Sequence, residues 1–424
     1  MKKRILAGTV ATLMLTMAAS SLAFAAEGEE KVTLSFCWWG NQTRNDVTKK
    51  AVDLYMEQNP NVEIKVEFTD WTGYWDKLST MAAGGNLPDI MQQDASYMNS
   101  YQSSGMLASL SEFIDSGVID TSKINASVIE SSTIDGNCYG ISSGVTALMM
   151  DYDKEIVEQA GVEIPEQMTF DEFYDISAEI YEKTGAMTYF DGGMNTLRYL
   201  ARSNGNVLYD EINAGDSTTV KEHFELVDKF AKAEFSITPE LLAEKNPYVV
   251  ETKPILDGTT WNDFSYCNQF ISISNAAGRE LEITMYPSKE EMKAQPMYLQ
   301  PAAFLSVAET SEHKEEAAKF INWFVNSVEC NEILMAERGI PVNSDVSEAI
   351  KPNADETFQK VFDYVAVVSE VAESIDPLEP AGRAEVDALL NTTVENLRYG
   401  DITVEEATES FMTDARRILE EAAK

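Results

Sequence analysis

The N-terminal third of the chain alternates between short apolar runs and longer amphipathic runs, and this alternation restricts the fold more than any other feature of the sequence. Apolar side chains at helical spacing predict helices from Thr43 to the stop at Asn59 and from Tyr74 to Ala83. The runs around these helices predict strands at Val32–Trp38, Asn61–Phe68 and Pro88–Asp94. Strands that alternate with helices form parallel sheets with crossover helices, so we expect one α/β lobe here.

The rest of the chain predicts a second α/β lobe that is richer in helix. An extended segment at Cys138–Asp153 leads into it, and a capping box of Thr169 and Glu172 starts a mostly helical region that reaches about residue 250. Strand character returns in two apolar runs, Tyr266–Ser274 and Glu280–Pro287. Further amphipathic helices are expected from Ser311 and from Thr403. A chain of 424 residues has the length that two such lobes require.

The first residues have the three parts of a secretory signal peptide. A basic start at Lys2–Arg4 precedes an apolar run at Ile5–Ala19 and a small-residue motif at Ala23–Ala25. We expect cleavage after Ala25, and because no cysteine adjoins that point, the signal is not that of a lipoprotein. No later run is long and apolar enough to predict a membrane span. The mature protein is therefore expected in the periplasm or outside the cell.

The net charge excludes two classes of partner. The chain has 32 lysines and arginines against 71 aspartates and glutamates, a formal net charge of −39. Long-range repulsion opposes an encounter with nucleic acid or with an anionic membrane. We therefore expect neither as a partner.

The cysteines and histidines suggest no metal or redox site. None of the four cysteines belongs to a C-x-x-C pair: Cys37, Cys138, Cys267 and Cys330. A chain this long can bury a core without disulfides, so buried free thiols are expected. The two histidines, His223 and His313, stand alone in charged helical segments, and surface positions are expected for both. No cofactor and no metal ion is predicted.

Tryptophans and hydrogen-bonding side chains gather at the ends of the predicted elements. Because neighbouring strand residues point to opposite faces, one of Trp38 and Trp39 is expected in the core and the other is expected to face a ligand cleft. Trp323 lies within a helix and is expected in the core. The other tryptophans and their polar neighbours at such positions are Trp71, Trp75, Trp261, Asn41, Gln42, Asp70, Gln93, Asp94, Asn262 and Asp263. Indoles pack on the C–H faces of sugars while amides and carboxylates bind hydroxyls, so this set favours a carbohydrate site over ordinary lobe packing.

Two carboxylates leave an enzymatic alternative open. Asp70 and Asp94 each follow a predicted strand, and a pair of carboxylates across one glycosidic bond is the equipment of a glycosidase. The chain has no G-x-S-x-G elbow, no P-loop, no H-E-x-x-H and no G-x-G-x-x-G that opens a helix. Arginines are scarce, which disfavours a dedicated phosphate or carboxylate pocket.

Several segments, taken in order, resemble one family. The chain is similar to the extracellular solute-binding proteins of ABC sugar importers, the group of the maltose- and multiple-sugar-binding proteins. Besides the strand that ends in "WWG", the matching segments are Tyr74–Asp94, Ala147–Pro165, Met168–Phe173, Lys314–Asn343 and Tyr399–Glu421. The chain departs from the family at the return crossing Leu299–Phe304, which is usually rich in glycine, and at Tyr152–Asp153, where the family usually has Tyr-Asn.

The resemblance implies a two-lobe periplasmic-binding-protein-like fold of type II, with the ligand in a cleft between lobes joined by hinge crossings. One lobe would comprise residues 26–141 and 294–342, and the other residues 142–293 and 343–424. The family's ligand positions correspond here to Trp39, Asn41, Gln42 and Asp94, to Trp261 as the principal stacking ring, and to Gln300 and the segment Glu379–Arg383. The protein would be a monomer.

The sequence favours a non-catalytic receptor that binds a carbohydrate, most simply an oligosaccharide, and passes it to a membrane permease. A first alternative is a secreted glycoside hydrolase or lyase that uses Asp70 and Asp94. A second is a receptor for another solute: a polyamine would suit the acidic residues, iron would require clustered tyrosines or histidines, and glycerol phosphate would require arginines.

Overall fold

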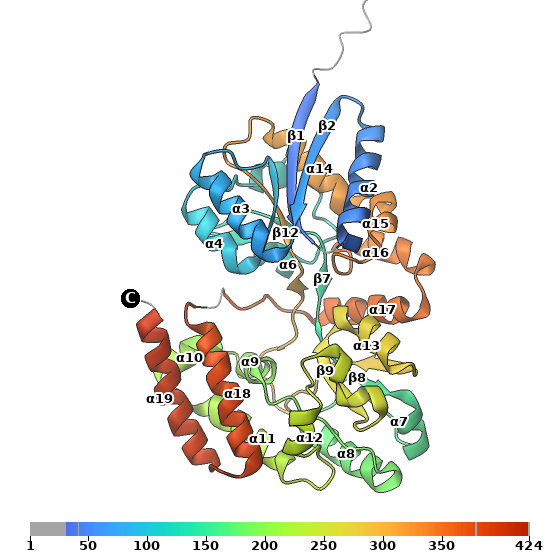
Figure 1. The fold of residues 1–424 in the computed structure, drawn as a ribbon, viewed down its shortest axis with the longest axis vertical. Coiled ribbons are helices and arrows are strands. Elements are labelled where there is room, and N and C mark those ends of the chain that lie inside the picture. The colour runs from blue at the N-terminus through green and yellow to red at the C-terminus, as the bar shows by residue number, and fades with distance from the viewer. Residues whose placement is uncertain (1–30, 41, 378–379, 423–424) are drawn as a thin grey trace, which may run out of the picture.

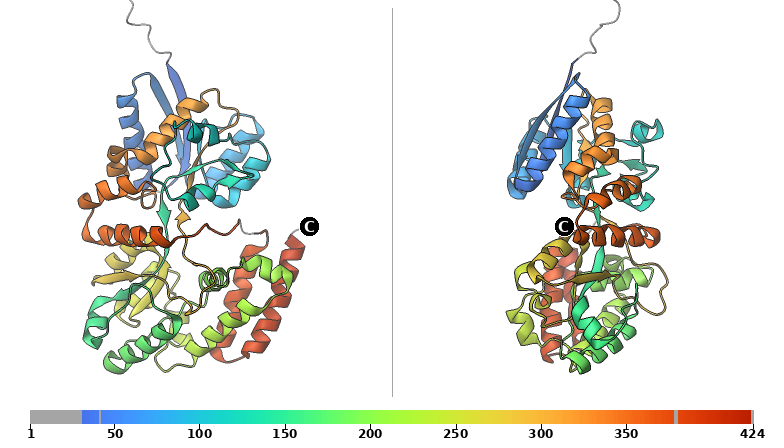
Figure 2. Two further views of the ribbon diagram at one scale, coloured as in Figure 1. Left: turned by 180° about the vertical axis from the view of Figure 1, so that it is seen from behind. Right: turned by 90° about the vertical axis from the view of Figure 1, so that its right-hand side faces the viewer.

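The computed structural model describes residues 31–40, 42–377 and 380–422, and it has two lobes joined by several chain crossings (Figures 1 and 2). The expected signal peptide and Asn41 lie outside the described residues. We call lobe 1 the five-stranded sheet with helices α2–α6 and α14–α16, and lobe 2 the three-stranded sheet with helices α7–α13 and α17–α19. Both lobes mix helices with sheet, as the sequence predicts, and the two-lobe α/β fold is confirmed.

The sheet of lobe 1 has the strand order β2-β1-β3-β12-β6. Its first three strands are parallel and lie close to their predicted positions: β1 (Val32–Trp39), β2 (Val62–Thr69) and β3 (Ile90–Gln93). The returning strand β12 (Phe304–Val307) runs antiparallel to β3 and to β6 (Ile141–Ser142). The carboxyl ends of β1, β2 and β3 therefore meet at the edge that faces lobe 2 (Figure 1).

The helices of lobe 1 follow the predicted crossovers, with one shift. The second helix begins at Trp71, three residues before the predicted Tyr74, because the Asp70 side chain caps it by accepting from the Gly73 backbone N–H at 2.9 Å. The helices of this lobe are α2 (Gln42–Gln58), α3 (Trp71–Ala83), α4 (Ala95–Ser103), α5 (Ser111–Asp115), α6 (Ala126–Glu130), α14 (Lys314–Asn326), α15 (Val328–Leu334) and α16 (Ser344–Ile350).

Lobe 2 is built on an antiparallel sheet of order β10-β8-β9. Its strands are β8 (Leu148–Asp153), β9 (Asn262–Tyr266) and β10 (Leu281–Thr284), and the capping box at Thr169 is present. In this lobe α18 and α19 pack against each other and against α11 (Figure 1). The helices are α7 (Lys154–Ala160), α8 (Phe170–Thr184), α9 (Met194–Ser203), α10 (Leu208–Ala214), α11 (Thr218–Ala231), α12 (Pro239–Glu244), α13 (Phe270–Ala277), α17 (Glu356–Val371), α18 (Arg383–Tyr399) and α19 (Val404–Ala422).

The prediction of a strand over Tyr266–Ser274 is wrong for every residue after Tyr266. Strand β9 ends at Tyr266, a short 3-10 turn follows, and α13 begins at Phe270. Phe270 and Ile273 are both buried, three residues apart on one helical face. A short apolar run fits a strand and a buried helix equally well, so its periodicity could not separate the two.

The crossings between the lobes are short and pack closely together. Strand β7 (Val145–Thr146) leaves lobe 1 and pairs antiparallel with the returning β11 (Gln300–Pro301). Val145 also exchanges backbone hydrogen bonds with Ile340, at 2.8 and 3.0 Å. Beside this contact a β-carbon on Gly144 would lie 2.2 Å from the carbonyl oxygen of Arg338, so only glycine fits there.

The burial of the cysteines agrees with the prediction from sequence, whereas that of one histidine does not. All four cysteines are buried free thiols, as predicted. His223 was expected on the surface, but it is fully buried on the inner face of α11, where its Nε2 lies 2.9 Å from the carbonyl oxygen of Gly192. His313 is partly exposed just before α14.

Trp323 was expected in the core, but it is only half-buried. Its indole N–H donates to the Gln58 side chain at 2.9 Å.

Candidate functional site

A cavity of about 990 Å³ lies between the lobes and is lined by both of them. Lobe 1 contributes the start of α4 and residues 302–304, and the crossings contribute Thr146 and Gln300. Lobe 2 contributes residues 191–198, Tyr248 and the segment after β9, and the C-terminal part contributes residues of the segment before α18 and of α18 itself. A solute in this cavity can therefore contact both lobes and the crossings between them.

The lobe 1 wall presents the polar start of α4. Asp94 caps this helix by accepting from the backbone N–H of Ser96 at 2.9 Å and from its hydroxyl at 2.5 Å. Asn99 lines the cavity one turn further along. These groups offer a carboxylate, a hydroxyl and an amide to hydroxyl groups of a ligand.

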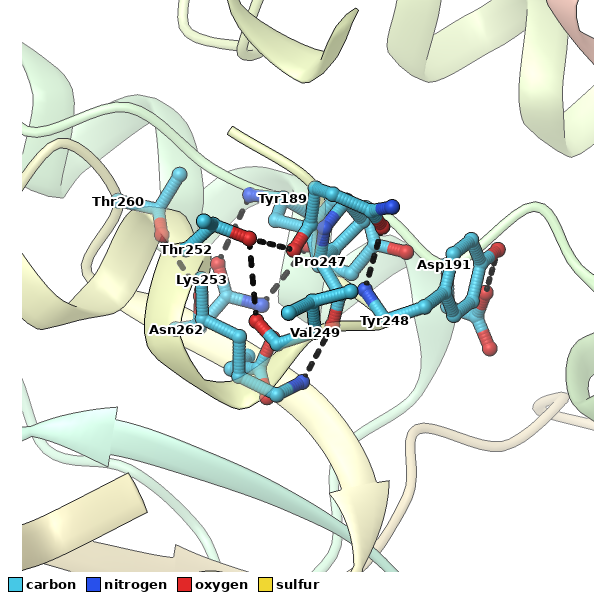
Figure 3. A network of polar contacts seen from close by, with 11 residues as sticks. Tyr189, Asp191, Pro247, Tyr248, Val249, Thr252, Lys253, Thr260 and Asn262 are labelled. Atoms are coloured by element: carbon cyan, nitrogen blue, oxygen red, sulfur yellow. Dashed lines mark hydrogen bonds and ion pairs between the residues drawn. The ribbon is translucent and has the colours of Figure 1, made fainter. Parts of the chain in front are cut away.

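The lobe 2 wall is centred on Asp191, which is 4% exposed. One carboxylate oxygen accepts from the Gly193 backbone at 2.9 Å, and the other accepts from the hydroxyl of Tyr286 at 3.1 Å. The Tyr248 hydroxyl donates to Asp191 at 3.4 Å (Figure 3). The carboxylate is thus held in one orientation at the edge of the cavity.

Tyr248 is the exposed aromatic ring of this wall. Although 63% of the residue is exposed, its hydroxyl end is enclosed, and that burial together with the Asp191 carboxylate raises the pKa of the phenol above its ordinary value. A largely exposed tyrosine whose hydroxyl is anchored is suited to pack against the apolar face of a sugar or of another flat ligand.

The segment Tyr189–Gly193 behind this wall is fixed by buried and half-buried side chains from several elements. Asn262 accepts from the Tyr189 N–H at 3.0 Å and donates to its carbonyl oxygen at 2.8 Å (Figure 3). Arg398 donates to the carbonyl oxygen of Phe190 at 2.7 Å, and His223 contacts Gly192. Burial lowers the pKa of His223 to about 4, so its ring is neutral near neutral pH.

The C-terminal wall combines carboxylates with an arginine. Arg383, at the start of α18, contacts Asp387 at 3.4 Å, and both line the cavity. Asp376 also lines it and forms a buried ion pair with Arg202 at 2.5 Å. Arg202 further donates to the carbonyl oxygens of Pro296 and Ser374, both at 2.8 Å, and so links α9 to two crossing segments.

Of the residues proposed from sequence, the structure brings Asp94, Gln300 and Arg383 together around the cavity. Gln42, Asp70 and Trp71 are exposed at the ends of strands β1 and β2 but are not part of its lining. Asn41 and Glu379 fall outside the described residues.

One of the paired tryptophans lies in the core as expected, but Trp39, the expected ligand contact, is not part of the cavity lining. Trp38 is fully buried in the core, where its indole donates to Asn45 at 2.9 Å. Trp39 points to the other face, but it is only 9% exposed because Trp71, Tyr74 and Trp75 surround it, with ring centroids 4.9, 5.3 and 5.7 Å away. In this group the ring that reaches solvent is Trp71, which is 43% exposed.

Trp261 and Asn262 are buried in lobe 2 behind the cavity wall and do not line the cavity. Trp261 was the expected principal stacking ring, yet it is fully buried, with its indole donating to the Thr188 hydroxyl at 2.8 Å and its ring packed near Phe173. Asn262 is equally buried and holds the backbone of Tyr189. In this structure neither offers a surface to a ligand. Both instead hold the segment that carries Asp191.

Asp70 and Asp94 do not form a pair in the cavity. Each accepts a hydrogen bond from the backbone at the start of its own helix, and only Asp94 lines the cavity. The two carboxylates therefore have capping roles that explain their positions without catalysis.

Sequence reasoning missed most of the lobe 2 wall. The missed lining residues with polar or aromatic side chains are Asp191, Asn195, Arg198, Tyr248, Tyr266, Asn268, Gln269, Asp376, Asp387 and Asn391. The "DGG" that begins at Asp191 was a usable signal, because it interrupts a helical region with a turn-forming sequence. Asn246-Pro247 likewise marks a turn directly before Tyr248, which lies in an irregular segment.

The described residues include no group of three or more histidines, cysteines, aspartates or glutamates arranged to hold a metal ion. Nor does any helix in the described ranges combine the length and apolar character that a membrane crossing requires.

A two-lobe α/β chain with a large polar cavity between its lobes has the architecture of a solute-binding protein. The family of bacterial extracellular solute-binding proteins matches residues 50–360, and the chain belongs to this family. Membership places it outside the cytoplasm, in the periplasm or the extracellular space.

Curated relatives match over part of their length. The chain is similar to a lactose-binding protein of Rhizobium radiobacter, 30% identical over 50% of this chain and 49% of the relative. It is 31% identical to the diacetylchitobiose binding protein DasA of Streptomyces coelicolor over 34% of this chain and 33% of the relative. The chain thus spans half or less of the length of these relatives.

A solved structure matches nearly the whole chain. A family 1 extracellular solute-binding protein from Alicyclobacillus acidocaldarius superposes on this chain with a TM-score of 0.85 and is 28% identical in sequence. The match covers 93% of this chain and 100% of that one. An oligogalacturonide binding protein of Yersinia enterocolitica, at 22% identity and a TM-score of 0.73, has the same fold.

Proposed function

We propose that this chain binds a carbohydrate, most simply an oligosaccharide, between its lobes and delivers it to the membrane permease of an ABC importer. The curated relatives named above are described as binding lactose and diacetylchitobiose, which supports a sugar as the ligand class. The residues that line the cavity supply the rest of the support.

The observation that carries the proposal is the pairing of Tyr248 with Asp191 on one wall, opposite the polar start of α4 on the other. An exposed ring can pack on the C–H face of a pyranose while neighbouring carboxylates and amides bind its hydroxyls. Tyr248 takes over the principal stacking role that the sequence assigned to Trp261. Asp191, Asp94, Gln300 and Arg383 are the hydrogen-bonding groups of the site.

Binding would close the cleft by bending at the crossings β7 and β11. A ligand held first by one lobe shifts the equilibrium toward a closed state only if it makes additional contacts there. The cavity satisfies this condition, because its lining comes from both lobes. The closed form would then dock on the permease.

Thermal unfolding against a panel of mono- and oligosaccharides tests the proposal. A ligand that binds only the folded state at a hundred times its Kd stabilises that state by roughly 2.7 kcal/mol, which raises the melting temperature measurably. A selective shift with one sugar family supports the proposal. A shift with spermidine or a metal ion, and none with any sugar, would replace the ligand class while leaving the fold intact.

We also propose that the protein is not an enzyme, since Asp70 and Asp94 act as helix caps. After long incubation with the protein, the sugar that binds should appear intact in a mass spectrum, whereas cleavage products would restore the hydrolase alternative.

Two further proposals concern the mature protein. Cleavage of the signal peptide after Ala25 is tested by N-terminal sequencing of the secreted protein, and a monomeric state is tested by light scattering.

A further inference from the structure

The segment that carries Tyr248, residues 245–253, is held by several hydrogen bonds, of which the one from Lys253 is buried. The Tyr248 backbone N–H donates to the Asn246 side chain at 2.9 Å. The Thr252 hydroxyl lies 3.1 Å from the carbonyl oxygen of Asn246 and 3.2 Å from that of Val249. The Lys253 ammonium donates to the carbonyl oxygen of Pro247 at 2.6 Å, directly before Tyr248 (Figure 3).

Lys253 makes this contact from the interior of lobe 2. Its side chain is 2% exposed and forms an ion pair of 2.7 Å with Asp263, whose side chain is 1% exposed. Asp263 lies on β9 directly opposite Asp151 on β8. Asp151 is also fully buried, and within the described residues neither of its carboxyl oxygens has a hydrogen-bond partner.

Two buried carboxyl groups thus lie on facing strand positions, and only that of Asp263 pairs with the Lys253 ammonium. Burial, followed by the charge of Asp263, raises the pKa of Asp151 well above its ordinary range, while Lys253 acts in the opposite direction. The Lys253 ammonium and the Asp263 carboxylate form a buried ion pair. A buried ion pair contributes little net stability compared with well-packed apolar side chains of similar size. The main consequence of this pair is therefore that it fixes the position of the Lys253 ammonium.

We propose that Lys253 is a positioning residue for ligand binding: anchored by Asp263, it fixes the Pro247 carbonyl group and thereby holds the Tyr248 ring at the cavity. The inference rests on the proposed function, because it assigns Tyr248 a ligand contact. Lys253 itself is not part of the cavity lining and acts through its neighbour.

A double-mutant cycle on sugar affinity tests this action through Tyr248. Lys253→Met is expected to raise the Kd of the sugar found in the panel about tenfold, but less than twofold when Tyr248 is already alanine. Lys245→Met is the matched control, since Lys245 lies in the same segment and pairs with the exposed Asp257; it should change Kd less than twofold. An equal loss of affinity in both Tyr248 backgrounds would overturn the proposal.

A second measurement needs no ligand. In protein labelled with 3-fluorotyrosine, the resonance of Tyr248 is assigned by its loss in Tyr248→Phe. Lys253→Met should shift or broaden this resonance, and Lys245→Met should leave it unchanged. If Lys253→Met does not fold, Asp263→Asn removes the charge that anchors the ammonium while keeping the side-chain shape, and a smaller change in the same resonance is expected.

The two measurements separate the two proposals. An unchanged Tyr248 resonance in the folded variants would disprove the positioning role even if sugars bind. A changed resonance in a protein that binds no sugar would disprove the proposed ligand class and leave the positioning role standing.

Discussion

In lobe 1 the edge that faces the cleft rests on packed rings, whereas in lobe 2 the wall rests on hydrogen bonds to buried polar groups. The rings of Trp39, Trp71 and Trp75 contact one another. The ring of Trp75 also stacks on that of Tyr97 in α4, with the ring centroids 3.7 Å apart. In lobe 2 the comparable support for Asp191 comes from the buried Asn262 and His223 and from the half-buried Arg398.

The difference teaches that each wall should respond to a different perturbation. Ring packing is non-directional and depends little on pH, so losing one ring creates a cavity but leaves the other contacts in place. A network of buried polar groups is directional and sensitive to protonation. Four predictions test this contrast.

The largest expected effect is on the stability of lobe 1. Trp38→Ala removes a fully buried indole and should lower the free energy of unfolding by roughly 3–5 kcal/mol. Because Trp38 points away from the cleft, sugar affinity of the remaining folded protein should stay within about twofold. Denaturant unfolding and calorimetry measure the two quantities. A loss of affinity without a loss of stability would show that Trp38 belongs to the site.

The second effect is the response of lobe 2 to acid. The folded pKa of His223 is about 4, below the 6.5 of the unfolded chain, so between these values the unfolded chain binds the proton and the folded state does not. Stability from this group is present above pH 6.5 and is lost as the pH falls to 4, by roughly 3 kcal/mol.

His223→Gln isolates this contribution. Asp263, whose pKa burial raises to about 6, acts in the opposite sense over part of the range, so the difference between wild type and variant is the informative quantity. Unfolding curves from pH 7 to pH 4 should show a smaller acid-induced loss in the variant. Parallel losses in both proteins would contradict the pKa assigned to His223.

The third prediction concerns the stacking ring. Tyr248→Ala should raise the Kd for the sugar about 30-fold, or ~2 kcal/mol, because it removes the exposed ring of the lobe 2 wall. Tyr248→Phe keeps the ring and loses only the contact with Asp191, so a change of a few-fold is expected. Tyr399→Ala, an exposed ring outside the cavity lining, serves as the control in titration calorimetry. Equal effects of the two alanine variants would refute the assignment.

The smallest effect is expected at Trp71. Trp71→Ala removes a half-exposed ring of lobe 1 that contacts Tyr97 of α4 but is not part of the cavity lining, so affinity should fall about threefold and stability by less than about 1 kcal/mol. If its loss of affinity exceeded that of Tyr248→Ala, the ring group of lobe 1 would be the main sugar platform.

Lobe 1 could be predicted from sequence in detail, because its elements form between neighbours in the chain. The runs at Val32 and Asn61 each have one dominant periodicity, and glycines or prolines mark where the helices end. Strand alternation predicted that Trp38 and Trp39 point to opposite faces, and the family resemblance assigned Trp38 to the core, where it lies.

The lobe 2 wall could not be predicted, because long-range contacts create it. Asp191 and Tyr248 lie 57 residues apart and meet only after folding. Trp261 carries the same local signals as a ligand-binding indole, but Phe173 and Thr188, distant in sequence, enclose it. Burial of a large ring by remote elements leaves no local pattern, and the same holds for His223.

The four buried thiols have a practical consequence. Burial raises the pKa of Cys37 to about 11 and those of Cys138, Cys267 and Cys330 above their ordinary value, so reactive thiolate is scarce in the native protein. A single cysteine introduced at the rim of the cleft would therefore react alone with a maleimide dye. Closure around a solute would change the surroundings of that dye, so the native chain is already suited to serve as an optical sensor without removal of its own cysteines.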